Sequence, residues 1–471
     1  MTGTILISIF LLVLGMLVVL TYYLRTIEKK MLLHHDGTES ELRLLERLHQ
    51  SQSYVYAGIV IASIGGIISL YFMVRGTLYE GHLMEWLNII IRLLHFTFGI
   101  AWIGASFYFV FLENALNRTE GVREELAGNL WAVHGGGFYY LEKYKVAPKT
   151  IPKHLHWFKY EAYFTWLTGF SLLFVVYYSN ASAMLIDPNV MKLTPWQGIA
   201  IGIGSFILAW ILYDLLCRTR LIKKPIVFAL IGFVILAAFA YGYAHVFNNR
   251  AAYLHFGAMM GSIMVANVFF VIIPAQKAMV KAARNGQMPD PSIGKHALSR
   301  SIHNNYFTLP VLFVMVSNHF PSTFGNNNQW IVLLVISVGL AAAKHYMNLR
   351  EQGKYSVWIL PVACIILLGA AFMTAPMPAG NDCKEEVTSA DVMPIIREKC
   401  AVCHSSKPTD DIYTAPPNGV MYETPADIIR LKDKIMQRVV VTKTMPPNNK
   451  TNITDAERRL IGCWIEQGAK Q

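Results

Sequence analysis

Charged residues are scarce in this chain. Asp, Glu, Lys and Arg make up 15% of its 471 residues, whereas hydrophobic residues make up 54%. A soluble globular protein carries about 25% charged residues, so this composition excludes an ordinary soluble fold and favours a membrane protein. Membrane spans are therefore the first structural feature to locate in the sequence.

Cysteine is also rare, with six residues in the whole chain. A chain of this length with so few cysteines is not a disulfide scaffold. Cys217 and Cys364 lie within or beside apolar runs, and we expect them to be inert packing residues. The other four lie in the polar last part of the chain: Cys383, Cys400, Cys403 and Cys463. Cys383 and Cys463 either form a disulfide or remain two unpaired thiols.

Apolar runs of about 20 residues, the length that crosses a hydrocarbon core of about 30 Å, recur ten times along the chain. We expect spans at about 4–24, 54–74, 87–112, 160–180, 196–217, 225–247, 252–276, 303–320, 329–350 and 355–375. The first run lacks a cleavage site after it, which predicts a retained span and not a signal peptide. The fold class predicted is all-α, a polytopic transmembrane helix bundle.

Lys and Arg gather in alternate loops between these runs. Arg218–Lys224 and Lys277–Arg284 are rich in them, whereas Ser317–Gln329 contains neither. The positive-inside bias then places the odd-numbered loops in the cytoplasm and both termini outside, which is the topology of a multi-pass bacterial inner-membrane protein. The formal net charge of +11 reflects this topology, so the predicted partner is the lipid bilayer and not nucleic acid.

The breaker-rich segment Pro376–Gly380 separates the apolar part from a polar tail. We therefore predict a transmembrane domain at 1–376 and a small domain at 377–471 on the periplasmic side. Within the tail, Ser389–Lys399 and Thr454–Gln467 are expected to be helices, and Thr454 with Glu457 forms a capping-box pattern at the start of the second.

The tail contains Cys400-Ala-Val-Cys403-His404, the C-x-x-C-H attachment motif of c-type haem. Cys400 and Cys403 would form the thioethers of one covalent haem c, and His404 would bind its iron. The alternative is a redox or zinc dithiol. Met445, held between Thr444 and two prolines, is the predicted sixth ligand, and His/Met ligation suits an electron acceptor. The competing methionines are Met421 and Met436.

Two histidines occupy matching places in two similar segments, Leu94-His95-Phe96 and Leu254-His255-Phe256. This match is either an internal duplication or chance. An ionisable group within a span is a functional candidate by default, so His95 and His255 could share a b-type haem or another metal centre. Alternatively, each imidazole hydrogen-bonds to a neighbouring helix. His245 and His319 lie at the same level and could substitute for them.

A second group of ionisable residues lies toward the cytoplasmic ends of the spans: Glu113, Glu161, Asp214, His303, Lys344 and His345. The plain interpretation is that these are interface anchors or ion pairs. Lys344 stands out, because a lysine well inside a span needs a counter-charge or an anionic ligand.

Four segments of the chain match a known family: Trp131–Tyr139, His154–Ala162, Cys400–His404 and Thr444–Asn448. Through these segments the chain resembles the membrane-bound urate oxidase (urate hydroxylase) family fused to cytochrome c. The resemblance covers essentially the whole chain. It implies purine catabolism, in which urate and water give 5-hydroxyisourate and the withdrawn electrons leave through the cytochrome domain. A soluble cytochrome or a terminal oxidase would then accept these electrons.

The resemblance provides no settled catalytic residues, so the site follows from physical argument. Urate is a planar anion, and its pocket should offer a cation, a proton acceptor and aromatic walls. We expect Lys344 and His345 to hold the anion and Glu161 or His303 to accept a proton. A centre at His95 and His255 would then relay electrons outward, unless urate binds near these histidines. The competing function is a respiratory protein that oxidises quinol or another small molecule.

Overall fold

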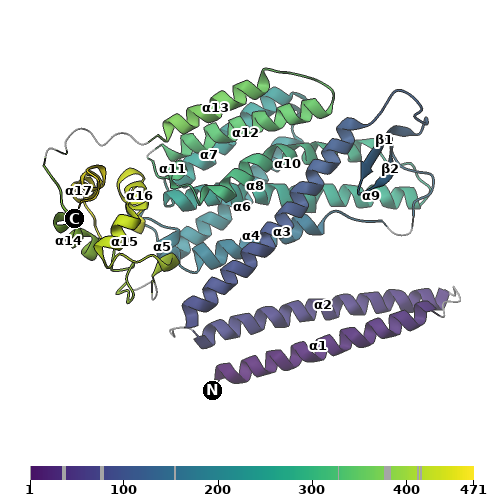
Figure 1. Cartoon of the computed structure of the whole chain (residues 1–471). Helices are drawn as coiled ribbons and strands as arrows, with labels where there is room; N and C mark the ends of the chain where they lie inside the picture. The colour runs from purple at the N-terminus through teal and green to yellow at the C-terminus, as the bar shows by residue number, and fades with distance from the viewer. Residues whose placement is uncertain are drawn as a thin grey trace. The chain divides into compact units, whose positions relative to one another are not determined.

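The computed structural model is mostly helical and describes residues 2–33, 39–74, 79–152, 155–326, 328–375, 383, 385–410, 413 and 416–470. It divides into two compact units, Met1–Leu87 and Asn88–Gln471, which are described separately (Figure 1). The predicted domain boundary at 376–377 lies outside the described residues, as do the linker residues Pro376–Gly380.

The first unit contains the helix pair α1 (Thr2–Leu33) and α2 (Glu39–Val74), which lie side by side (Figure 1). Polar contacts join them near one end: the Gln52 amide donates to Glu28 Oε2 at 2.7 Å, and Arg25 Nε donates to the Tyr56 hydroxyl at 3.1 Å. Helix α3 (Tyr79–Ala115) begins in this unit and continues into the second.

The second unit contains a helical bundle. After α3, its elements are α4 (Tyr160–Leu173), η1 (Phe174–Tyr178), α5 (Ala181–Met184), α6 (Pro195–Arg218), η2 (Arg220–Lys223), α7 (Pro225–Ala244), α8 (Asn249–Ala266), η3 (Asn267–Ile272), α9 (Ile273–Arg284), α10 (Pro291–Ser317), α11 (Pro321–Phe324), α12 (Gln329–Glu351) and α13 (Ile359–Met373). Segments η1 and η3 are π-helical and continue α4 and α8 without a break. Such π segments are rare and often occur at functional sites.

Each of the ten predicted spans coincides with a helix or with a helix and its π-helical continuation. Among the described residues, six helical stretches are long and apolar enough to cross a membrane: Tyr54–Val74, Tyr79–Ala115, Pro195–Arg218, Pro225–Ala244, Asn249–Arg284 and Gln329–Glu351. Helix α13 is apolar but has only 15 residues. Helix α10 contains the run Arg300–Asn305, whose polar residues lower its apolar content. The structure therefore supports a polytopic helical protein with fewer clear spans than predicted.

Several helices begin where local sequence favours a helix start. The Thr194 hydroxyl accepts from the backbone N–H of Gln197, whose side chain accepts from the Thr194 backbone in return, and Pro195 occupies the first turn of α6. Helix α10 begins with a simpler cap, in which the Asp290 carboxylate accepts from the Ser292 backbone N–H, and Pro291 occupies the first turn.

A β-hairpin interrupts the helices between α3 and α4. Strands β1 (Leu126–His134) and β2 (Gly137–Tyr144) pair in antiparallel register through a two-residue turn. Gly135 and Gly136 form this turn with φ of +58° and +79°, a conformation that glycine adopts without steric cost. The all-α prediction lacked this hairpin, because the glycine run was interpreted as part of a loop.

Helix α8 lies at the centre of the bundle and packs against α4, α6, α7 and α10. Its residues His255, Phe256, Met259 and Met260 are fully or almost fully buried. The aromatic side chains around them form the main apolar core, which includes Tyr178, Phe206, Tyr243 and Phe247.

The C-terminal region, residues 385–470, has an apolar core of its own. Its elements are α14 (Ser389–Lys399), η4 (Pro417–Gly419), α15 (Pro425–Arg430), α16 (Lys432–Ile435), η5 (Met436–Val441), η6 (Pro447–Asn449) and α17 (Asp455–Glu466). Helices α14 and α17 pack together, and their buried residues Ile396, Ile461 and Trp464 belong to this core. Both predicted helices and the Thr454–Glu457 capping box are confirmed.

Two glycines of α8 allow a test of this packing. A Cβ on Gly257 would lie 2.5 Å from Val314 Cγ1 on α10, whereas a Cβ on Gly261 would meet nothing within 4 Å. We expect Gly257→Ala to destabilise the bundle by about 1–3 kcal/mol through overpacking. Gly261→Ala should leave it unchanged or stabilise it by up to about 1 kcal/mol. Thermal unfolding in detergent measures both, and equal effects would contradict the close approach of α8 and α10.

Candidate functional site

The C-x-x-C-H motif forms a compact turn at the end of α14. Cys400 is the C-cap of the helix, and its carbonyl accepts from the backbone N–H groups of Cys403 at 3.2 Å and His404 at 3.0 Å. Neither Cys400 nor Cys403 forms a disulfide, and Cys400 packs against the apolar core of the C-terminal region. Burial raises the pKa of the Cys400 thiol to about 12. The turn thus brings two unbridged sulfurs and one imidazole together.

The His404 imidazole is held in one orientation. Its Nδ1 donates to the Val420 carbonyl at 3.0 Å, which leaves Nε2 as the unprotonated nitrogen of the neutral ring. Burial also lowers the pKa of His404, which favours the neutral form. A hydrogen bond from Nδ1 that fixes the ring and leaves Nε2 available is the usual arrangement of a metal-binding histidine.

Met445 packs against the same core cluster as Cys400. Its backbone is fixed on both sides, because its N–H donates to the Arg438 carbonyl at 3.0 Å and its carbonyl accepts from Arg458 at 2.7 Å. Arg458 is buried and also donates to the Val439 carbonyl and to Asn449 Oδ1. The sequence interpretation missed this arginine.

The two competing methionines lie in different settings. Met436 begins η5 and packs against the core cluster as Met445 does, whereas Met421 is exposed. The thiols, the imidazole and a partly buried thioether are the kinds of donor that a c-type haem needs. The residues present therefore fit this group.

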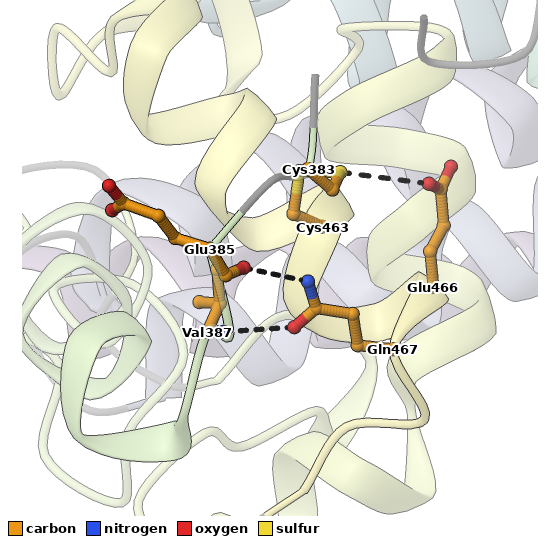
Figure 2. Close-up of a disulfide and its surroundings, with 6 residues drawn as sticks. All are labelled: Cys383, Glu385, Val387, Cys463, Glu466 and Gln467. Carbon is orange, nitrogen blue, oxygen red and sulfur yellow. Dashed lines mark hydrogen bonds between the residues drawn. A yellow bond between two sulfur atoms is a disulfide. The ribbon is translucent and has the colours of Figure 1, made fainter. Parts of the chain in front are cut away.

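A disulfide joins Cys383 to Cys463, so the bridged alternative of the two weighed from sequence is confirmed. The Cα atoms are 5.5 Å apart, and the bridge closes a sequence separation of 80 residues. Figure 2 shows how Gln467, just after α17, supports it: the side-chain amide donates to the Glu385 carbonyl and accepts from the Val387 N–H, both at 2.9 Å. The start of the C-terminal region is thus held against its last helix.

The C-terminal region contacts the bundle beside the Met445 loop. The Asn448 amide donates to the Ile186 carbonyl at 2.8 Å and to the Ala183 carbonyl at 3.3 Å. A second contact is at Gly325, which lies so close to Thr442 that a Cβ added to this glycine would overlap the threonine. Both bundle segments belong to loops that the sequence predicts to be poor in Lys and Arg.

His255 is completely buried in the aromatic core of the bundle. Its Nδ1 donates to the Ala251 carbonyl at 2.8 Å, so its Nε2 accepts from the Tyr178 hydroxyl at 3.1 Å. Both ring nitrogens therefore already have hydrogen-bond partners in this structure.

His95 contacts α4, the helix whose π-helical continuation η1 carries Tyr178, the partner of His255. Its Nδ1 donates to the Thr165 carbonyl at 3.0 Å, and its ring lies against Gly169 on α4. Gly169 and Tyr178 are nine residues apart, which corresponds to about 14 Å along a helix. The structure thus does not bring His95 and His255 together. Both substitutes are exposed: His245, which donates to its own helix at the Tyr241 carbonyl, and His319.

A buried polar network links α6, η3 and α10. The fully buried Arg300 donates to Asp214 Oδ1 at 2.6 Å and to Asn267 Oδ1 at 3.3 Å. The Asn267 amide in turn donates to the Tyr213 hydroxyl at 3.1 Å, and this hydroxyl lies 2.8 Å from His303 Nδ1. The sequence pointed to Asp214 and His303 here. It missed Arg300, which precedes the predicted span on α10.

Lys344 belongs to a separate cluster between α10 and α12. Its side chain is 0% exposed, and its Nζ lies 3.8 Å from the centre of the Phe107 ring on α3. Within the described residues, Nζ has no hydrogen-bond partner. Asn348, one turn along α12, donates to Asn305 Oδ1 on α10 at 3.0 Å.

The part of the chain that the structure describes contains no group of three or more His, Cys, Asp and Glu side chains that could hold a metal ion.

Comparison with known proteins identifies the family of the bundle. A profile described as urate oxidase N-terminal matches residues 81–375, which is more than half of the chain. The chain belongs to this family. No match was found among curated proteins or among solved structures.

The matched urate oxidase region extends from α3 through α13 and contains both polar clusters, whereas the C-terminal region follows it. Membership of the family supports an oxidoreductase that acts on urate. It does not extend to the haem motif, which rests on the geometry at Cys400–His404.

The predicted catalytic residues are distributed over several places in the urate oxidase region. Lys344 is buried, but the neighbouring His345 is exposed and shares a hydrogen bond with the Tyr306 hydroxyl at 2.6 Å. His303 belongs to the Arg300 network. Glu161 lies in the first turn of α4, and its Oε2 is buried without a hydrogen-bond partner among the described residues.

Removing the disulfide should destabilise the C-terminal region. Closing a loop of this length is worth about 4 kcal/mol, so the double change Cys383→Ser with Cys463→Ser should lower its unfolding free energy by roughly that amount. Hydrogen exchange of peptides from α14 and α17 in increasing urea measures the loss. Cys364→Ser, which removes an exposed unbridged thiol, is the matched control. Equal protection in both proteins would contradict a stabilising bridge.

Proposed function

We propose that this chain is a membrane-bound urate oxidase that passes electrons from urate to a c-type haem on its own C-terminal region. The observation that carries the proposal is the combination of two features in one chain. Residues 81–375 match the urate oxidase family, and the same chain holds Cys400, Cys403 and an oriented His404 in one turn. Neither feature alone connects urate oxidation to an internal electron acceptor.

The proposed reaction balances without molecular oxygen. Urate and one water give 5-hydroxyisourate, two electrons and two protons. When bound, a c-type haem accepts electrons one at a time and delivers them to a further acceptor, such as a soluble cytochrome or a terminal oxidase. Cys400 and Cys403 would attach it and His404 would bind its iron. Met445 is proposed as the second residue that would bind the iron, because Arg458 and Arg438 fix its backbone beside the core.

We assign the urate anion to Lys344. A buried ammonium without a hydrogen-bond partner among the described residues is costly in an apolar surrounding, and an anionic ligand would reduce that cost. His345 is proposed at the edge of this site, where it contacts Tyr306. Glu161 or His303 would accept a proton. His303 is favoured by its hydrogen bond to Tyr213, which leads into the Arg300 network.

Several observations support a periplasmic place for the C-terminal region and a bacterial inner-membrane location for the bundle. Disulfides such as Cys383–Cys463 persist in oxidising compartments. The contacts of Asn448 with Ala183 and Ile186, and the close approach of Gly325 to Thr442, involve loops that the charge pattern assigns to the outer side.

Electrons must travel from the Lys344 cluster toward this outer side. Lys344 lies 15 residues after Gln329, which corresponds to about 22 Å along α12. The second redox centre predicted from sequence at His95 and His255 would shorten this path; it stays a prediction, although the two side chains do not meet in this structure. A pyridine haemochrome spectrum distinguishes one haem type from two.

Urate should reduce the haem of the purified full-length protein in the absence of oxygen. We expect Lys344→Met to slow this reduction by about 100-fold or more, because it removes the charge that holds the anion. Haem content should be unchanged. Lys277→Met, which removes an exposed lysine on α9, is the matched control.

Stopped-flow absorption of the haem band follows the reaction. Unchanged rates in Lys344→Met would exclude Lys344 from the site. Reduction by a quinol but not by urate would instead support the respiratory alternative.

A further inference from the structure

Two amide side chains next to Lys344 also contain buried polar atoms without partners. Asn305 is 1% exposed and Asn348 is 8% exposed. Asn348 Nδ2 donates to Asn305 Oδ1 at 3.0 Å, but Asn305 Nδ2 and Asn348 Oδ1 have no hydrogen-bond partner among the described residues. Buried polar groups are nearly always satisfied in folded proteins, so unpaired ones need an explanation.

The unpaired atoms form a definite chemical pattern. One is an N–H donor and the other is a carbonyl acceptor, and they belong to two amides that are already hydrogen-bonded to each other. Exchanging the oxygen and nitrogen of both amides would preserve that bond and would again leave one donor and one acceptor. The edge of the Asn305–Asn348 pair therefore matches a ligand edge that carries an acceptor beside a donor.

The cation lies next to this edge. Lys344 and Asn348 are four residues apart on α12, which places their side chains on the same face of the helix. Asn305 reaches Asn348 from α10, and Phe107 of α3 contacts the Lys344 ammonium. Three helices thus contribute a positive charge, a donor, an acceptor and an aromatic ring to one place.

The other polar cluster of the bundle does not have this pattern. Asp214 already pairs with Arg300 and Arg218, and Asn267 has partners for both of its amide atoms. Only Nε of Arg300 lacks a partner within the described residues of that network. Its groups mainly satisfy one another, whereas those around Lys344 do not.

We infer that Asn305, Asn348 and Lys344 form a recognition site for the N–H/C=O edge of a planar, anionic heterocyclic amide. Asn305 donates to a ring carbonyl, Asn348 accepts from the adjacent ring N–H, and Lys344 neutralises the negative charge. Urate belongs to this class, so the inference rests on the proposed function and adds two specificity-determining residues to it. Two adjacent hydrogen bonds from side-chain amides are also how proteins read the edges of purine bases.

Binding of urate to full-length protein whose haem has been reduced with dithionite tests this site, because a reduced haem cannot accept electrons and no turnover occurs. Isothermal titration calorimetry should show that Asn305→Ala and Asn348→Ala each weaken urate binding by about tenfold or more. The near-isosteric Asn305→Leu, which keeps the packed volume, should weaken it similarly. The matched control is Asn249→Ala, which removes the amide–amide hydrogen bond to Gln329 at the other end of α12.

Methylated urates provide a second readout that a merely structural role would not change. Methylation of the ring nitrogen that donates to Asn348 should weaken binding to the unmodified protein by about tenfold or more. In Asn348→Ala this penalty should disappear, because the acceptor is gone and its space is free. The probes are the four monomethyl urates, measured on the same dithionite-reduced proteins.

The outcomes separate the two proposals. If urate reduces the haem of the unmodified protein but the Asn305 and Asn348 variants bind urate as tightly as Asn249→Ala and keep its methyl preferences, the recognition site is overturned and the function stands. If urate binds with the expected preferences but never reduces the haem, the proposed oxidation is overturned and the site stands. If urate does not bind at all, both are overturned.

Discussion

Polar side chains that are buried between apolar helices must find their partners inside the protein, because neither hydrocarbon nor a packed core can replace water. This constraint organises the bundle. Helix α10 carries polar residues toward two neighbours: Arg300 and His303 contact the side of α6 and η3, and Asn305 contacts α12. On the first side the groups largely satisfy one another. On the second, Lys344 Nζ and one edge of the Asn305–Asn348 pair have no hydrogen-bond partner within the described part of the chain.

The two clusters suit different tasks. A closed network such as Asp214–Arg300–Asn267–Tyr213–His303 orients its members and fixes the packing of three elements, and the π-helical segment η3 places Asn267 within its reach. An open cluster such as the one at Lys344 stores unfavourable burial energy that a complementary ligand can release. Buried polar atoms without hydrogen-bond partners among the described residues thus occur where we propose that urate binds. This is expected of a binding site.

The C-terminal region contacts the bundle through the loop that follows Met445. The same short loop that follows Met445 places Asn448 against the carbonyls of Ala183 and Ile186. Just after these carbonyls along the chain, Gly198 on α6 packs tightly against Ile186. A change in this contact would therefore affect both the docking of the region and the position of Met445, the proposed iron-binding methionine.

The sequence predicted what depends on local pattern. Hydropathy located the helices of the bundle, the capping box located α17, and the C-x-x-C-H motif located the turn at Cys400. Arg300 was missed because it precedes the apolar run that defined its span. Asn305 and Asn348 were missed because neutral amides are not flagged as ionisable, although the i, i+4 spacing of Lys344 and Asn348 could have revealed their shared face. The absence of contact between His95 and His255 depends on how high each helix sits in the bundle, which no local pattern encodes.

The central claim is that electrons from urate reach a haem on the same chain and that water supplies the new oxygen. An anaerobic titration of the purified protein with urate in ¹⁸O-labelled water measures both the haem reduced and the isotope content of the product. We expect two haem equivalents to be reduced per urate consumed, with one labelled oxygen atom in 5-hydroxyisourate. Consumption of urate that requires molecular oxygen, leaves the haem oxidised or yields unlabelled product would contradict the claim.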